Sequence, residues 1–234
     1  MTQWTFQKAR ELLACLIARG GSAVPREEAA EALWPEGDPG QTQHLLSNAA
    51  YYLRRALKGA APNPDAQFFA TSGQRYHLRS GLFQVDVDAF EGHLRRAESL
   101  QGADALAEYE RALALYRGDF LAGEPYEWAA THRQEYQRKL IAAAHAAARL
   151  AMDCRDATKA KDFYRAILAR EPIDEEAARG LMHCHAKAGD LNGVRKVYKV
   201  LAESLRRELD DDKAEPLPET AALLRELTRQ PDRV

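Results

Sequence analysis

One acid-free amphipathic stretch, residues 43–58 (QHLLSNAAYYLRRALK), constrains the fold of this chain more than any other feature. Its apolar residues recur at steps of three and four, which places them on one face of an α-helix that packs on a core. The chain has no acidic residue between Asp38 and Asp65, so the outward face lacks the Glu–Lys pairs of an ordinary solvated helix. The predicted core-facing residues are Leu45, Leu46, Ala49, Ala50, Leu53, Ala56 and Leu57.

The outward face of this helix combines cations, amide and hydroxyl groups, and aromatic rings. Cations neutralise phosphates, while short amide or hydroxyl side chains pair with base edges, so the face suits nucleic acid. A basic helix that is merely solvated is the alternative, and this stretch alone does not choose between the two. The residues concerned are His44, Ser47, Asn48, Tyr51, Arg55 and Lys58, with Tyr52 and Arg54 on the flanks.

The segments around this helix predict a winged helix-turn-helix. Helical apolar spacing occurs over residues 5–19 and 25–34, and the run at 68–78 alternates around Ser72-Gly73-Gln74, as in a β-hairpin. In a winged helix the third helix enters the major groove and the hairpin reaches backbone phosphates. On this hypothesis Ser47, Asn48 and Tyr51 approach bases, whereas Arg54, Arg55, Lys58, Arg75 and Arg79 hold phosphates.

Composition describes an ordinary globular protein whose charge is only slightly uneven. The first 85 residues hold nine basic and seven acidic residues, which permits local DNA contact without requiring it. No apolar run is long enough to span a membrane, and the first twenty residues lack a signal-peptide pattern, so we expect a cytoplasmic protein without membrane contact. Cys15, Cys154 and Cys184 lie within apolar helical patterns and are expected to be buried thiols.

From residue 86 onward the pattern is helical throughout. Ala160, Tyr164, Ile167 and Pro172 have the spacing of the second helix and terminal proline of a tetratricopeptide repeat. A shift of one 34-residue period keeps the packing positions at Val194, Tyr198 and Leu201 but replaces the proline by Arg206. We therefore expect a mainly α protein with two domains. Residues 1–85 form the winged helix-turn-helix, and residues 86–234 form stacked helical repeats whose concave face is free for a partner.

Several motifs, in order, resemble the SARP-type bacterial transcriptional regulators. In these proteins a response-regulator-type winged helix precedes a tetratricopeptide-like bacterial transcriptional activator domain (BTAD). The resemblance implies sequence-specific binding of double-stranded DNA, usually at direct repeats, and recruitment of RNA polymerase or another protein; it also leaves room for a homodimer on DNA. The motifs are residues 8–14 (KARELLA), 31–34 (EALW), 53–57 (LRRAL), 112–121 (ALALYRGDFL), 127–129 (EWA), 180–182 (GLM), 188–190 (AGD), 208–209 (EL) and 218–220 (PET).

Three departures from the family pattern bear on DNA binding. The winged helix of the family usually follows a small antiparallel sheet, but only four residues precede Thr5. We therefore expect that sheet to be missing, and Met1 to begin either a trimmed chain or a piece of a longer protein. Tyr51 and Tyr52 stand where the family commonly has Ser and Arg, and His44 stands where Arg is frequent. These changes remove cations from the DNA-facing helix.

Two other classes of function follow from the same residues. An interaction module whose winged helix no longer binds DNA is favoured by the Tyr51–Tyr52 pair and the near-neutral first domain. An enzyme is disfavoured, because the common nucleophile, phosphate-loop and zinc-protease motifs are absent from the sequence. His183 and His185 flank Cys184, but alternate helical residues point in different directions and cannot share one metal locally. The sequence therefore predicts no catalytic residue, metal site or cofactor.

Overall fold

The computed structural model describes residues 7–20, 22–60, 68–79 and 84–229. The chain separates into two compact units. The first unit comprises residues of Met1–Ala89 and Gly118–Tyr136, and the second comprises residues of Phe90–Arg117 and Gln137–Val234. The described residues form ten helices and a small three-stranded sheet, which confirms the mainly α fold predicted from the sequence.

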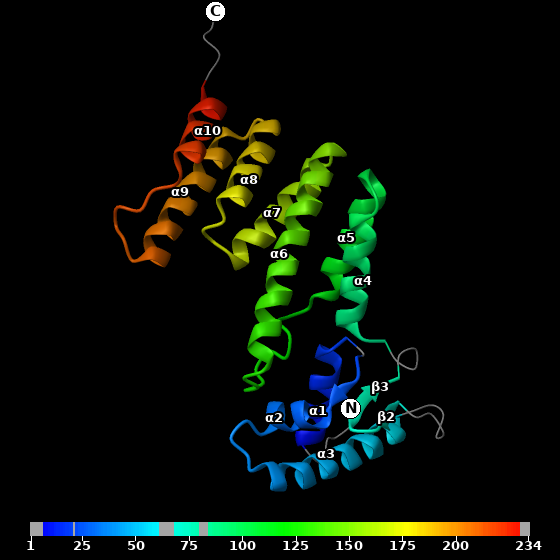
Figure 1. Ribbon diagram of the computed structural model, residues 1–234. Coiled ribbons are helices and arrows are strands. Elements are labelled where there is room, and N and C mark those ends of the chain that lie inside the picture. Colours follow the sequence, from blue (N-terminus) through cyan, green and yellow to red (C-terminus); the bar gives the residue numbers. More distant parts are fainter. Residues whose placement is uncertain (1–6, 21, 61–67, 80–83, 230–234) are drawn as a thin grey trace, which may run out of the picture. The chain divides into compact units, whose positions relative to one another are not determined.

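The first unit is a three-helix core with a β-hairpin (Figure 1). Asp38 Oδ1 accepts hydrogen bonds from the backbone N–H groups of Gly40 and Gln41, so the third helix begins earlier than predicted. Gly73 has a φ of +59° and turns the hairpin without a steric penalty. The elements are α1 (Gln7–Ala18), β1 (Val24–Pro25), α2 (Arg26–Leu33), α3 (Pro39–Ala60), β2 (Phe69–Ser72) and β3 (Arg75–Leu78).

The hairpin belongs to an antiparallel sheet of order β1-β3-β2, in which Val24 pairs with Tyr76 and Phe69 with Leu78. The sequence did not predict β1, because Pro25 looked like the start of a helix. The expected missing sheet before α1 concerns residues 1–6, which lie outside the described residues. The core of this unit contains Leu12, Leu16, Leu33, Leu46, Ala49, Ala50, Leu53, Phe69 and Tyr76.

Residues 118–136 pack within the first unit. Trp128 packs against its hydrophobic core, and Arg10 Nη2 forms an ion pair of 2.6 Å with Glu124 Oε1. Arg133 holds the preceding loop by donating to the carbonyl oxygens of Phe120 and Glu124 at 3.0 and 2.7 Å. The sequence pattern had not indicated this grouping, and the division of the chain into domains at residue 85 stays a prediction.

In the described part of the second unit, all the secondary-structure elements are helices. Asp156, Asp174 and Asp190 each cap the helix that follows, and each accepts a hydrogen bond from the backbone N–H three residues on. The elements are α4 (Asp86–Glu98) from Phe90 onward, α5 (Gly102–Leu115), α6 (Ala129–Asp153) from Gln137 onward, α7 (Ala157–Arg170), α8 (Glu175–Lys187), α9 (Leu191–Leu209) and α10 (Pro218–Thr228).

The repeat positions predicted from the sequence are packing positions in the structure. Ala160, Tyr164 and Ile167 of α7 are buried together with alanines of α6 and residues of α8. In the shifted copy Val194 and Leu201 are buried. Gly180 of α8 lies directly against the Tyr164 ring, which leaves no room for a larger residue there.

Two burial predictions were wrong. Leu45 is 38% exposed, because it lies at the margin of the apolar face of α3 and the core closes over Leu46 instead. Cys154 is exposed, since it follows the end of α6 at a turn, while Cys15 and Cys184 are buried as expected.

A partly buried pair of ionisable side chains in the second unit couples stability to pH. His145 Nε2 lies 2.8 Å from Asp174 Oδ2. The hydrogen bond with Asp174 raises the pKa of His145 above its usual value although burial opposes this. Burial acts to raise the pKa of Asp174, but hydrogen bonds from His145 and from the Ala177 N–H lower it overall. The pair is therefore ionised in the folded protein near pH 6.

Replacing His145 with glutamine is expected to reduce the free energy of unfolding most at mildly acidic pH. The raised histidine pKa contributes stability that is complete below about pH 6.5 and is lost as pH rises through the folded pKa. The lowered aspartate pKa contributes stability that is lost as pH falls below about 4. We expect a loss of roughly 1–2 kcal/mol at pH 5.5 and clearly less at pH 8.5. Urea unfolding at both pH values measures this, and equal losses would contradict an ionised pair.

Candidate nucleic-acid interface

All ten residues predicted to contact DNA are exposed on the first unit. Eight lie on α3, while Arg75 begins β3 and Arg79 follows it. Helix α3 contacts both α1 and α2, which leaves its opposite side open (Figure 1). The eight on α3 are His44, Ser47, Asn48, Tyr51, Tyr52, Arg54, Arg55 and Lys58.

Five of these residues form a single line along α3, which we call the α3 stripe: His44, Asn48, Tyr51, Arg55 and Lys58. They follow one another at steps of four, three, four and three residues. At 3.6 residues per turn the line stays within roughly 80° of the helix circumference and is about 21 Å long. It lies opposite the buried line of Leu46, Ala49, Ala50 and Leu53.

The polar groups of the α3 stripe have no hydrogen bond or ion pair with any other side chain in the part of the chain that the structure describes. The Tyr51 ring is 56% exposed and makes an edge-on contact with Tyr52, with the ring centroids 5.3 Å apart. Helix α3 contains three cations and no acid along its whole length. These donors are therefore available to an anionic ligand.

Three other predicted contact residues have partners within the unit. Ser47 Oγ accepts from Arg26 Nη2 at 2.9 Å and donates to the Gln43 carbonyl at 2.9 Å. Arg54 Nη2 donates to Thr71 Oγ1 at 2.6 Å, and its guanidinium lies over the Phe69 ring. Arg75 Nη1 donates to the Ala23 carbonyl at 3.2 Å. The bonds of Ser47 and Arg54 connect α2 and the hairpin to α3, and the bond of Arg75 connects β3 to the residue before β1.

Arg26 is a residue of this interface that the sequence reading missed. Its backbone N–H donates to the Gln74 carbonyl in the hairpin turn, while its side chain reaches Ser47 on α3 and lies over the Tyr76 ring. One residue thus joins α2, α3 and the hairpin. Burial raises the pKa of Tyr76 although the charges of Arg26 and Arg54 oppose this, so the Tyr76 hydroxyl stays neutral. No local pattern at residue 26 indicated these contacts, because every partner is distant in sequence.

Replacing Arg26 with alanine is expected to weaken binding to duplex DNA without changing its dependence on salt. The substitution removes the Ser47 hydrogen bond and the packing on Tyr76, so it loosens α3 relative to the hairpin and costs about 1 kcal/mol of folding stability. Arg26→Lys is the matched variant, since it keeps the charge and loses the planar donor. Fluorescence anisotropy at several salt concentrations gives the slope. A slope flatter by about one unit would mean that Arg26 itself contacts a phosphate.

The histidines on either side of Cys184 have different surroundings and do not share a site. His183 is exposed, whereas His185 is buried and its Nδ1 lies 2.7 Å from Asp190 Oδ2. Within residues 7–20, 22–60, 68–79 and 84–229 no three His, Cys, Asp or Glu side chains are grouped so as to hold a metal ion. Among the helices described, none has the length and apolar character needed to cross a membrane.

A three-helix unit with a β-hairpin, in one chain with stacked helical pairs, defines the class of winged-helix folds with tetratricopeptide-like repeats. The chain belongs to the bacterial transcriptional activator domain family, whose model matches residues 85–228. The resemblance to SARP-type transcriptional regulators is thereby confirmed.

Two relatives extend over most of the chain. It is 28% identical over 212 residues to the regulatory protein AfsR of Streptomyces coelicolor, an alignment that covers 87% of this chain and 20% of AfsR. The solved structure of Mycobacterium tuberculosis EmbR, in complex with a low affinity phosphopeptide, matches with a TM-score of 0.78 at 20% identity and covers 96% of this chain and 60% of EmbR. The likeness to EmbR shows the fold, and the chain spans only a part of both relatives.

Proposed function

We propose that this chain regulates transcription by binding double-stranded DNA through α3, with the β2–β3 hairpin beside the phosphate backbone. The observation that carries the proposal is the α3 stripe, a line of exposed side chains on an acid-free helix whose polar groups have no hydrogen bond or ion pair among the described residues. A helix of this kind in the major groove presents its side chains to base edges and its cations to phosphates.

The position of each side chain suggests its role on DNA. Asn48 is suited to a two-point hydrogen bond with adenine, and the Tyr51 ring to contact with a thymine methyl. His44 lies one turn before Asn48 on the same line. Arg55 and Lys58 near the end of the helix, with Arg79 after β3, are suited to phosphates. Ser47, Arg54 and Arg75 position α3 and the hairpin, and Tyr52 supports the ring of Tyr51.

The helical repeats of the second unit supply the protein contacts in this proposal. Stacked helical pairs present continuous surfaces to a partner, which in a transcriptional regulator is RNA polymerase or another regulatory segment. Two protomers on direct repeats of DNA are compatible with the same scheme.

A second function, an interaction module without DNA binding, is favoured by the aromatic pair on α3. An exposed tyrosine beside a second tyrosine is typical of protein interfaces, where such rings dominate binding energy. On this alternative the α3 stripe contacts a protein.

Binding to random duplex DNA at two salt concentrations distinguishes the two functions. Three exposed cations have no side-chain partner among the described residues and predict a log–log salt slope of about −2.7: Arg55, Lys58 and Arg79. A slope near this value supports DNA binding through α3. The absence of binding at low salt would favour the interaction module instead.

A further inference from the structure

The second unit has an open groove between α7 and α9 that neither the DNA-binding proposal nor the family assignment uses. Its volume is about 590 Å³, and α8 forms its floor. The lining residues come from these three helices and from the turns between them: Arg165, Leu168, Ala169, Pro172, Ala178, Leu181, His185, Asp190, Asn192, Gly193, Lys196, Val197, Val200, Leu201 and Ser204.

The surface of the groove is mostly apolar. Leu181 of α8 and Leu201 of α9 are buried, and Leu168 of α7 and Val197 of α9 are half-buried. Val200 is 50% exposed although it has a purely hydrocarbon side chain. Apolar groups that converge on a concave surface gain free energy when another apolar surface covers them.

Unpaired positive charge flanks this apolar surface. Arg165 on α7 and Lys196 on α9 are exposed, and neither forms an ion pair with any residue that the structure describes. Asp190 is the one acid among the lining residues given above, and its carboxylate is already occupied by the Gly193 N–H and by His185. An occupant with carboxylates near the groove therefore meets two free cations and no free lining acid.

The groove is elongated. Its lining residues on α9 run from Asn192 to Ser204, which at 1.5 Å per residue is about 18 Å, or more than three helical turns. A helix that enters such a groove places side chains at positions i, i+3 or i+4, and i+7 along it. Val197 and Val200, three residues apart on α9, match that spacing.

We propose that the groove between α7 and α9 binds an acidic amphipathic helix. The apolar side of that helix covers Leu168, Val197 and Val200, and its carboxylates meet Arg165 and Lys196. This inference rests on the protein-partner part of the proposed function. It involves the second unit alone, so it can be tested independently of DNA binding by α3.

The test uses the 234-residue chain and a displayed library of 14-residue helical peptides whose outward positions are randomised. Selection on the protein is expected to enrich peptides with apolar residues at i, i+3 or i+4, and i+7, flanked by Asp or Glu. Enriched peptides are then synthesised with a fluorophore and titrated. Lys196→Glu and Arg165→Glu are each expected to weaken binding about tenfold, and Val200→Glu at least as much.

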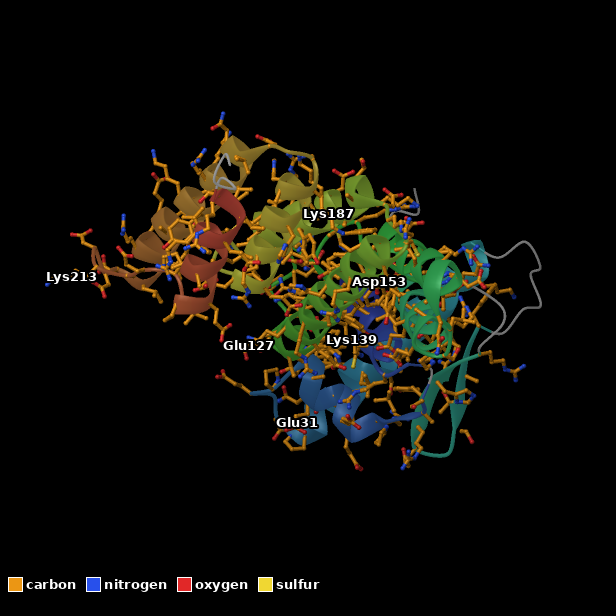
Figure 2. All side chains as sticks on the ribbon, turned by 90° about the horizontal axis from the view of Figure 1, so that it is seen from above. Glu31, Glu127, Lys139, Asp153, Lys187 and Lys213 are labelled. Atoms are coloured by element: carbon orange, nitrogen blue, oxygen red, sulfur yellow. The ribbon has the colours of Figure 1, made fainter. Side chains whose placement is uncertain are left out.

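Lys213→Glu is the matched control, because it reverses one exposed charge on the connection between α9 and α10 (Figure 2) at a residue that does not line the groove. It is expected to leave peptide binding within about twofold. Replacing the acidic residues of a selected peptide by glutamine is expected to weaken its binding to the protein about as much as Lys196→Glu does. Enrichment of peptides without acids, equal effects of Lys213→Glu and Lys196→Glu, or no enrichment at all overturns the proposal. DNA binding by the Lys196→Glu variant stays unchanged, which separates this site from α3.

Discussion

Replacing Gly180 with alanine is expected to lower the free energy of unfolding by about 1–3 kcal/mol. A Cβ at this position would stand 2.2 Å from Cζ of the Tyr164 ring and 2.5 Å from two further ring carbons. Tyr164 is itself buried among residues of α6 and α8, so the ring has little space into which to move. Without this clash alanine would stabilise the helix by about 1 kcal/mol relative to glycine. A destabilising Gly180→Ala therefore shows that the contact with Tyr164 outweighs helix propensity.

Gly92→Ala in α4 is the control for Gly180→Ala. Its added Cβ meets only Arg96 Nη1, at 3.5 Å, so the change should be neutral or stabilising. Combining Gly180→Ala with Tyr164→Leu removes the ring that causes the clash, and the two losses should then be less than additive. Urea unfolding of the four variants gives the comparison. A stabilising Gly180→Ala would show that α7 and α8 are farther apart than described.

Replacing both Arg55 and Lys58 by glutamate is expected to remove most of the affinity for duplex DNA. The loss of two phosphate contacts should lower the association constant at 50 mM salt by about two orders of magnitude. The log–log salt slope should flatten from about −2.7 to about −0.9. Both side chains are exposed and have no partner among the described residues, so the folded protein should tolerate the change.

The control for this variant is a double charge reversal elsewhere, Lys213→Glu with Arg225→Glu. Both residues are exposed in the second unit, and the net charge of the protein changes by the same amount. If the control lost as much DNA affinity as the Arg55 and Lys58 variant, general charge rather than α3 would account for binding. Unfolding curves of both variants show whether the fold is retained.

The parts of the fold that could be predicted from sequence are those set by short-range patterns. The apolar period of residues 43–58 gave the core face of α3 because a helix repeats every few residues. The alternation of apolar and polar residues on both sides of Gly73 predicted the hairpin, because successive strand residues point to opposite faces. The predicted burial of Leu45 was wrong because this residue lies at the edge of the apolar face, where burial depends on the neighbouring elements.

The parts that could not be predicted depend on residues far apart in the chain. Strand β1 has two residues and exists because β3, some fifty positions later, offers hydrogen-bonding partners. Arg26 belongs to the candidate interface through Ser47 and Tyr76, neither of which is near it in sequence. The distinction between free cations such as Arg55 and tied ones such as Arg54 likewise follows from the position of Thr71. Composition and periodicity contain no record of such contacts.

The most direct test of α3 as a sequence-reading helix compares two single variants, Asn48→Ala and Arg55→Ala. A cognate duplex is first selected from random DNA with the unmodified chain, and each variant is then titrated against that duplex and a scrambled one. Asn48→Ala should weaken cognate binding by about 1–3 kcal/mol and leave scrambled DNA nearly unaffected, because an amide reads bases. Arg55→Ala should weaken both alike and flatten the salt slope by about one unit. Equal losses on both duplexes for both variants would contradict sequence reading by α3, and no loss for either would mean that α3 does not contact DNA.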